Sequence, residues 1–404
     1  MKLNQERWLL PTGIEEILPP QAREMERLRR CLLDLFDAWG YDLVIPPFID
    51  YLESLLTGTG RDLDLQTFKL TDQLSGRLLG VRADMTPQVA RIDAHQLRRE
   101  GPTRLCYLGT VLHTRSDGFA GTRSPMQIGA DIYGHAGAES DVEILRLLLM
   151  TLQTAGIDSA YLDLGHVGIF RGLAEQAGFS REQELALFGI LQRKASTELT
   201  ALLEESGVEP AVADMLLALV ELNGDDALER AGRLLGPARD GVHQALENLR
   251  LIASELRAWL PDVPVHFDLG ELRGYTYKTG VVFAAFVPGW GLEIARGGRY
   301  DAIGEFFGHA RPAVGFSTDL KGLIGLALAR AGSAASETVT GAVLAPNERD
   351  PELRARVEEL RASGRRVLNW LPGQQGRPDD LGVTHQLERR DGRWELVPVS
   401  PGER

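Results

Sequence analysis

Two apolar runs in the first third of the chain predict a pair of neighbouring strands. The first run covers residues 105–108 and the second covers residues 126–133. A polar, glycine-rich loop at residues 115–124 lies between them. Because side chains alternate between the two faces of a strand, Gln127, Gly129 and Asp131 should share one face of the second strand. The pattern therefore predicts an antiparallel pair with a basic, flexible loop, as a cover over an anionic ligand would be.

An amphipathic pattern near the N-terminus predicts the first long helix, over residues 23–39. Its apolar side chains recur at helical spacing, at Met25, Leu28, Leu32, Leu33, Leu35 and Phe36. Gly40 ends the helix, and residues 41–47 follow as a strand that stops at two prolines. Six further segments between residues 173 and 260 also show helical spacing, which predicts a helical insertion.

These patterns divide the chain into a core, an insertion and a tail. The core covers residues 1–165 and 264–330, the helical insertion covers 166–263, and residues 331–404 form a linker and a truncated C-terminal α/β region. The elements predicted for this last region are a linker at 331–336, a strand at 341–344, a helix at 351–363, a strand at 366–370 and a hairpin at 387–397. The expected fold class is α+β, with a mostly antiparallel sheet and flanking helices.

Composition narrows the possible settings of this fold. The chain has 404 residues, of which 44% are hydrophobic, so it can bury a substantial core. It contains no run of about eighteen apolar residues and begins with a polar segment, so neither a membrane span nor a secretory signal is expected. We therefore expect a cytoplasmic protein in which Cys31 and Cys106 are buried small hydrophobes, not a disulfide or a metal site.

The predicted hairpin resembles motif 2 of the class II aminoacyl-tRNA synthetases, and most closely that of the histidyl enzymes. Aligned without a gap, the family's phosphate-binding arginine falls on His113 and the glutamate after it falls on Arg115. An arginine holds phosphate through a planar, permanently charged fork, whereas a histidine is mostly neutral near pH 7. The resemblance implies a degenerate nucleotide site here, although His113 can also be a structural histidine without a ligand.

Two later segments resemble further parts of the same synthetase core. Residues 297–301 match the family's GGRYD turn without change. Residues 313–323 resemble motif 3, but Gly322 stands where the family has the arginine that contacts ATP, and Asp319 replaces a glycine. Because a carboxylate there would repel a polyanion, the resemblance implies that adenylation is lost while the backbone frame remains.

The family's amino-acid pocket is better preserved than its nucleotide site. Residues 79–88 resemble the LRPEGT element that holds the ammonium of histidine, and residues 272–280 resemble the RGLDYYTG signature, with Thr276 and Lys278 as departures. A carboxylate and a hydroxyl are suitable acceptors for an ammonium group. The resemblance implies a histidine-binding site formed by Asp84, Thr86, Gln127, Asp131, Arg273 and Tyr277.

Structural roles remain open for the same residues. Asp84 and Thr86 can instead cap the helix expected to begin near Pro87. The polar residues of the second hairpin strand can form the polar face of an edge strand, and Arg273 can be a structural ion-pair partner. Lys278 is expected to be a solvated charge and not a Schiff-base lysine.

A synthetase core with a disabled ATP site, an acidic balance and a short tail resembles the regulatory subunits of ATP phosphoribosyltransferase, the first enzyme of histidine biosynthesis. In that family a synthetase paralogue assembles with a short-form catalytic chain, and histidine inhibits the complex. The resemblance implies no catalytic residue, cofactor or metal on this chain, because ATP, phosphoribosyl pyrophosphate and magnesium bind the partner. It also implies a homodimer through the segment 23–47, within a hetero-oligomer.

Two other functions remain alternatives, namely a divergent histidyl-tRNA synthetase and a synthetase-like tRNA sensor. Both require attraction to tRNA, which a net charge of −13 opposes. We therefore expect histidine as the effector and no tRNA or membrane partner. The sequence leaves open whether histidine binds the former amino-acid pocket or a seam between subunits.

Overall fold

The computed structural model describes residues 8–58, 61–116, 122–272, 274–275, 277–331, 341–375 and 377–399. The chain forms two compact units, residues 1–329 and 330–404, and each is described by itself. Three sequence expectations concern residues outside the described ranges. They are the binding role of Arg273, the centre of the hairpin loop at 117–121, and most of the linker at 331–336.

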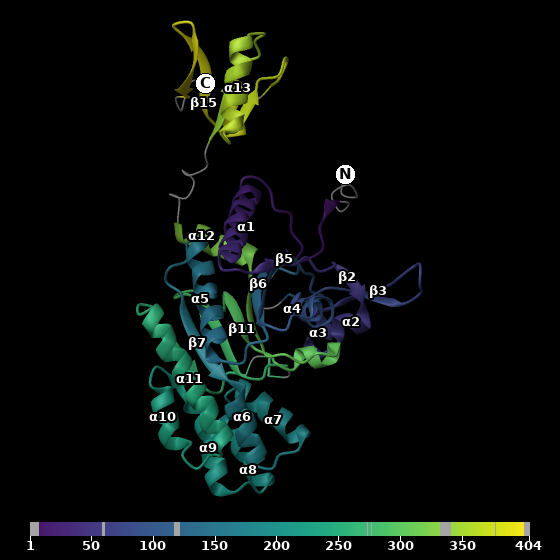
Figure 1. The fold of residues 1–404 in the computed structure, drawn as a ribbon, viewed down its shortest axis with the longest axis vertical. Coiled ribbons are helices and arrows are strands. Elements are labelled where there is room, and N and C mark those ends of the chain that lie inside the picture. The colour runs from purple at the N-terminus through teal and green to yellow at the C-terminus, as the bar shows by residue number, and fades with distance from the viewer. Residues whose placement is uncertain are drawn as a thin grey trace. The chain divides into compact units, whose positions relative to one another are not determined.

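The first unit combines a large sheet with helices on both of its sides (Figure 1). Its strands are β1 (Asp42–Leu43), β2 (Ile49–Tyr51), β3 (Phe68–Thr71), β4 (Leu78–Val81), β5 (Thr103–Thr110), β6 (Met126–Tyr133), β7 (Tyr161–His166), β8 (Asn223–Gly224), β9 (Val265–Asp268), β10 (Val281–Phe286), β11 (Ala295–Arg299) and β12 (Ala313–Asp319).

The first unit also contains helices and short helical turns, and six of the helices, α6 to α11, lie between β7 and β9 in the sequence. In order they are α1 (Gln21–Ala38), α2 (Leu52–Leu56), α3 (Arg61–Gln66), α4 (Thr86–Arg91), the π-helical turn η3 (Ile92–Leu97), α5 (Ala138–Thr154), α6 (Val167–Gln176), α7 (Arg181–Gln192), α8 (Ser196–Glu205), α9 (Pro210–Glu221), α10 (Ala227–Leu234), α11 (Asp240–Trp259), the 3-10 turn η4 (Ile303–Phe307) and α12 (Leu320–Ala331). Among the helices described, none is both long and apolar enough to cross a membrane.

The large sheet has nine strands in the order β1-β5-β6-β12-β11-β10-β7-β9-β8. Only β1 with β5 and β7 with β9 pair in parallel, and the other neighbouring strands are antiparallel. The predicted hairpin is present, because β5 and β6 pair along their whole length, from Thr103 opposite Tyr133 to Thr110 opposite Met126. The expected α+β class with a mostly antiparallel sheet is confirmed.

The two faces of the large sheet are covered by different elements. On one face, side chains such as Ile128, Ala130 and Phe316 pack into a core with α1, α5 and α11. Helices α6–α11 gather at the β7 end of the sheet, and α2–α4 lie on the opposite side from α5 and α11 (Figure 1). Because side chains alternate along a strand, the residues of β6 and β12 that lie between these core residues point to the other face, toward α4.

Helix α1 has the predicted amphipathic pattern, with one correction. It buries Met25, Leu28, Leu32 and Phe36, which helical spacing places on one face. Cys106 is buried as expected, but the burial predicted for Cys31 is wrong. Cys31 is exposed because it lies off the face of α1 that these four residues turn toward α5.

The strand predicted over residues 41–47 is much shorter in the structure. Only β1 pairs with β5, and the chain then leaves the sheet. The following prolines have no backbone N–H to donate, and their carbonyls accept side-chain hydrogen bonds instead. Arg82 Nη1 donates to the Pro46 oxygen at 2.7 Å and Gln88 Nε2 to the Pro47 oxygen at 3.0 Å.

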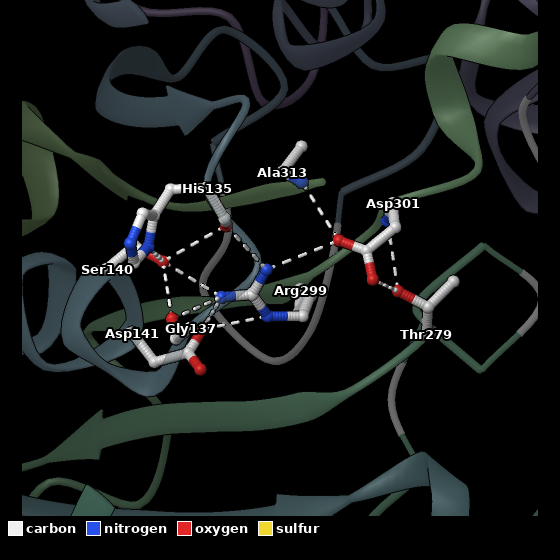
Figure 2. A network of polar contacts seen from close by, with 8 residues as sticks. All are labelled: His135, Gly137, Ser140, Asp141, Thr279, Arg299, Asp301 and Ala313. Atoms are coloured by element: carbon white, nitrogen blue, oxygen red, sulfur yellow. Dashed lines mark hydrogen bonds and ion pairs between the residues drawn. The ribbon is translucent and has the colours of Figure 1, made fainter. Parts of the chain in front are cut away.

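A buried ionic network fastens α5 to β11 on the core face of the sheet. Figure 2 shows the Arg299 guanidinium between the start of α5 and Asp301. Its Nε and Nη2 donate to Asp141 Oδ1 at 3.0 and 2.7 Å, and further donors reach the Ser140 hydroxyl and the His135 carbonyl. Burial raises the pKa of Asp141 to about 6 although the Arg299 charge acts to lower it. The matching GGRYD segment therefore has a structural role in this chain.

The second unit is a small α/β unit. It contains β13 (Ala342–Ala345), α13 (Pro351–Ala362), β14 (Val367–Asn369), the 3-10 turn η6 (Pro378–Leu381), β15 (Val383–Arg390) and β16 (Arg393–Pro398). The sheet order is β14-β13-β15-β16, with only the last pair antiparallel. Asp391 and Gly392 both have positive φ, 48° and 82°, which a tight hairpin turn requires. The predicted hairpin and its turn are confirmed.

Candidate functional site

The candidate site lies on the face of the large sheet that looks toward α4, and glycines line it. Cross-strand register places four of them, Gly109 on β5, Gly129 on β6, Gly315 on β12 and Gly298 on β11, on this one face. Each lets a polar group from another residue approach the sheet backbone, because a Cβ there would meet the side chain of Arg82, Tyr107, Asp131 or Lys278, respectively. We call this surface the glycine-lined face.

At the start of α4, three of the predicted residues form one hydrogen-bonded group. Asp84 Oδ1 accepts from Gln127 Nε2 at 2.7 Å, and from the backbone N–H and hydroxyl of Thr86 at 2.9 and 3.0 Å. Gln127 Oε1 in turn accepts the Met85 N–H at 2.9 Å. The contact from the Thr86 N–H closes a local turn ahead of α4, whose N-cap residue is Met85 and which has no side-chain cap. The same carboxylate also faces the site, since its charge acts on the hydroxyls of Tyr107 and Tyr277.

Asp131 lies deeper, in a setting of buried tyrosines. It is 1% exposed, and the hydroxyl of Tyr133 donates to its Oδ2 at 3.3 Å, with Tyr107 and Tyr300 buried in the same cluster. Burial raises the pKa of Asp131 to about 8, and the nearby Asp84 charge acts in the same direction. The Asp131 side chain is therefore a neutral acid near pH 7, able to donate a hydrogen bond as well as accept one.

This neutral state predicts a pH-dependent stability that Asp131→Asn should remove. The unfolded chain releases this proton near pH 4 and the folded chain near pH 8, so the folded state binds more protons between those values. Its stability should fall by about 1 kcal/mol per pH unit as the pH rises through that window.

Calorimetric melting temperatures from pH 5 to pH 8 measure the effect. We expect the Asp131→Asn variant to melt several degrees above the wild-type chain at pH 8 and close to it at pH 5. The exposed Asp158→Asn is the matched control. Melting curves of the wild type and Asp131→Asn that shift in parallel with pH would contradict a neutral Asp131.

A loop between β9 and β10 covers part of the glycine-lined face. Tyr275 is fully buried and fastens the loop to the helical region, since Arg171 on α6 donates to its carbonyl at 2.8 Å and Arg181 on α7 to its hydroxyl at 3.1 Å. Tyr277 keeps 38% of its surface exposed. The solvated charge expected for Lys278 is wrong, because this side chain is 7% exposed and its Nζ donates to the Gly297 carbonyl above Gly298.

At the position of the phosphate-binding arginine, His113 is built into the fold. The side chain is 9% exposed, and its Nε2 lies 2.9 Å from the Ala83 carbonyl oxygen, a contact that makes it a donor to that oxygen. Its own carbonyl accepts from Arg123 Nε at 3.0 Å. His113 is therefore anchored by hydrogen bonds within the fold, while Arg115 is exposed.

The other two departures lie at the start of α12. Asp319 Oδ1 accepts the N–H groups of Met126 and Lys321 at 2.9 and 3.1 Å, so the residue ties β6 to the N-terminus of the helix. Burial raises the pKa of Asp319, and these backbone donors oppose the shift. Gly322 is exposed, and the atoms nearest to a Cβ built there belong to Asp319 at 3.8 Å. An arginine would fit at 322, but beside a carboxyl group.

The structure brings together most of the residues that the sequence selected. Asp84, Thr86 and Gln127 touch one another, and the Tyr107 hydroxyl lies 3.2 Å from that of Thr86. Tyr107 packs with Tyr133, the donor to Asp131, in the same buried cluster. Sequence reasoning missed Tyr107, Tyr133, Tyr300 and Lys321. Lys321 Nζ donates to Ser124 Oγ and Glu15 Oε1 at 3.1 and 3.2 Å.

Family models match both units of the chain. A model described as histidyl-tRNA synthetase matches residues 13–323, and one described as the C-terminal domain of the ATP phosphoribosyltransferase subunit HisZ matches residues 340–397. The second match covers the tail that the sequence predicted to be a truncated α/β region.

Curated relatives are similar along nearly the whole chain. The ATP phosphoribosyltransferase regulatory subunit of Alkalilimnicola ehrlichii is 58% identical over 97% of this chain and 98% of its own. The protein of the same name from Methylococcus capsulatus is 56% identical over 98% of this chain and 97% of its own.

Solved structures give the same fold. A structure from Bacillus halodurans, described as an ATP phosphoribosyltransferase regulatory subunit/histidyl-tRNA synthetase, is 26% identical, with a TM-score of 0.80 over 91% of this chain and 94% of its own. Histidyl-tRNA synthetase from Nostoc is 20% identical, with a TM-score of 0.77 over 97% of both chains, a likeness of fold alone. The expected class II synthetase-like core is confirmed.

Proposed function

The chain belongs to the family of ATP phosphoribosyltransferase regulatory subunits, and from this we propose that it controls the first step of histidine biosynthesis by binding histidine and a catalytic partner. The observation that carries the proposal is identity above half over nearly the full length of two regulatory subunits, together with the match of the tail to the HisZ domain. The alternatives of a divergent synthetase and a tRNA sensor are not favoured.

We place the histidine site on the glycine-lined face at the start of α4. Supporting this, Asp84 offers a carboxylate, and Thr86 and Gln127 hold it in one orientation. An ammonium group can take the place of the Gln127 donor, because an ionised acceptor binds a charged donor more strongly than a neutral one. Asp131 and Tyr107 then supply a neutral acid and a hydroxyl, both of which suit a neutral imidazole ring. Arg273 and Tyr277 complete the proposed site.

Asp84→Asn tests this placement in the assembled complex. Asparagine keeps an oxygen that can accept the Thr86 N–H but loses the charge, so the histidine concentration for half inhibition of phosphoribosyl transfer should rise by about tenfold or more. Steady-state inhibition curves measure the change, and light scattering follows assembly independently. The exposed Asp262→Asn is the matched control. Equal inhibition of the wild-type and Asp84→Asn complexes would move the effector site to a subunit interface or to the partner.

We further propose that this chain has no catalytic residue, cofactor or metal of its own. The partner is then a short-form catalytic chain of the phosphoribosyltransferase that binds ATP, phosphoribosyl pyrophosphate and magnesium in the cytoplasm. In support of this, His113 and Asp319, at positions aligned with the family's nucleotide site, make hydrogen bonds within the fold. Differential affinity of histidine for two arrangements of the complex would shift their balance, by about 1–3 kcal/mol in typical systems.

A homodimer through α1 and the segment that follows it is also proposed. Strand β1 is at the edge of the large sheet, and the segment around it exposes apolar side chains to 43–80%, at Leu43, Ile45, Phe48 and Ile49. Apolar side chains exposed in one continuous stretch are typical of an interaction surface.

Ile45→Asp should therefore convert the dimer to a monomer at micromolar concentration, because a charge buried at an interface without a partner is costly. Light scattering coupled to size exclusion measures the mass. The exposed Leu234→Asp on α10 serves as the control and should leave the mass unchanged. A wild-type chain that is already monomeric, or an Ile45→Asp variant that stays dimeric, would reject this interface.

A further inference from the structure

Arg296 is a cation on the glycine-lined face that no synthetase motif assigns. Four neighbouring strands form one row of paired residues here. Arg296 on β11 lies opposite Ser317 on β12, and Ser317 lies opposite Gly129 on β6. Gly129 in turn lies opposite Tyr107 on β5. Directly opposed residues of antiparallel strands point to the same side of a sheet, so Arg296 shares the face of Tyr107. Its side chain is 59% exposed, in contrast to the buried residues that follow it along β11.

Three other cations around this face have their donors directed to backbone oxygens. Arg82 donates to the carbonyls of Pro46 and Thr110, and Arg123 to that of His113. Lys278 is buried and donates to Gly297. Arg296 differs, because within the described ranges its Nη1 pairs with Glu293 Oε1 at 3.1 Å while the side chain stays 59% exposed.

The charges of the site are separated along this face. Burial raises the pKa of the Tyr277 hydroxyl to about 12, and the nearby Asp84 carboxylate adds to this shift while the Arg296 guanidinium opposes it. The Asp84 carboxylate and the exposed Arg296 guanidinium are therefore both close enough to the Tyr277 hydroxyl to act on it electrostatically. An amino acid carries an ammonium and a carboxylate on the same carbon, and it needs one partner of each sign.

We propose that Arg296 binds the carboxylate of the amino-acid effector and makes this site select amino acids over the corresponding amines. The inference rests on the proposed histidine site and adds the residue that distinguishes a zwitterion from a cation. A guanidinium recognises a carboxylate through paired N–H groups, and Ser317 on the neighbouring strand adds a hydroxyl to the same row.

Calorimetric titration of the full-length chain with L-histidine and with histamine, which lacks the carboxylate, tests this assignment. The wild-type chain should prefer histidine by about tenfold to a hundredfold, as expected for a charge-assisted pair. Arg296→Gln should reduce this preference to about threefold or less while leaving histamine affinity unchanged, and Arg296→Lys should restore part of it. Arg233→Gln, an exposed arginine on α10, is the matched control and should keep the full preference.

The outcomes separate this inference from the function on which it rests. An Arg296→Gln variant that keeps the wild-type preference overturns the assignment of Arg296 and leaves the histidine site in place. So does a loss of the preference in Arg273→Gln but not in Arg296→Gln. A wild-type chain that binds neither ligand overturns the histidine site, and the assignment of Arg296 with it. Circular dichroism and melting temperature verify that each variant is folded.

Discussion

The full-length chain on its own is expected to catalyse histidine-dependent exchange of pyrophosphate into ATP at least about 10³-fold more slowly than a histidyl-tRNA synthetase. Removing one preorganised group that stabilises developing charge typically costs about 10²–10³ in rate, and two arginine positions are changed here. His113 donates to the Ala83 carbonyl and Gly322 has no side chain to offer. Radiolabelled pyrophosphate exchange, with a histidyl enzyme assayed in parallel, measures the difference.

Restoring both arginines should not restore the reaction. In His113→Arg the longer side chain must leave a site that is 9% exposed and built around the Ala83 carbonyl. In Gly322→Arg the new guanidinium has room, but Asp319 lies beside it and competes with phosphate for the charge. The double variant should therefore stay at least about 10²-fold below the synthetase. Exchange at synthetase-like rates by the wild-type chain would refute the proposed loss of adenylation.

Asp141→Ala is expected to destabilise the first unit by about 3–5 kcal/mol, the usual cost of removing one partner from a buried ion pair. The Arg299 side chain is 8% exposed and would keep its charge without the carboxylate that accepts two of its donors. The Asp301 carboxylate, 3.4 Å from Nη1, and the remaining carbonyl and hydroxyl acceptors hold the guanidinium in place, so it cannot turn to solvent without cost. Thermal unfolding of the full-length chain measures the shift.

A paired replacement separates the charge from the shape of this site. Asp141→Leu with Arg299→Met removes both charges and fills a similar volume, and such exchanges are often neutral. We expect the double variant to unfold closer to the wild type than Asp141→Ala does. If Asp141→Ala unfolds at the wild-type temperature, the network of Figure 2 does not stabilise the attachment of α5 to β11.

The sequence predicts the fold well where a pattern repeats over many residues. Strand β6 is eight residues long, and side chains alternate between its two faces. The sequence alone therefore places Gln127, Gly129 and Asp131 on one face. Helix α1 is equally regular. The strand predicted over 41–47 fails because its apolar character reflects a surface stretch and not sheet pairing, and hydropathy alone does not distinguish the two.

The candidate site is only half visible in the sequence, because its other half depends on cross-strand register. Tyr107 reaches the site because it lies opposite Gly129, and Asp131 fits because Gly315 has no side chain. Neither pairing can be read from spacing within one strand. The glycines were the available signal, since a Gly at alternate positions of a strand indicates close approach of another group. The burial of Lys278 had no such signal.

The anchoring of Tyr275 limits how freely parts of this fold could be exchanged between relatives. A chimaera that replaces residues 167–259 with the corresponding helices of another protein would remove Arg171 and Arg181, and with them the donors to the Tyr275 carbonyl and hydroxyl. The stacking of Phe188 on this ring would be lost as well. The helical region and the loop over the glycine-lined face therefore depend on each other structurally, and a chimaera that folds correctly must take both from the same protein.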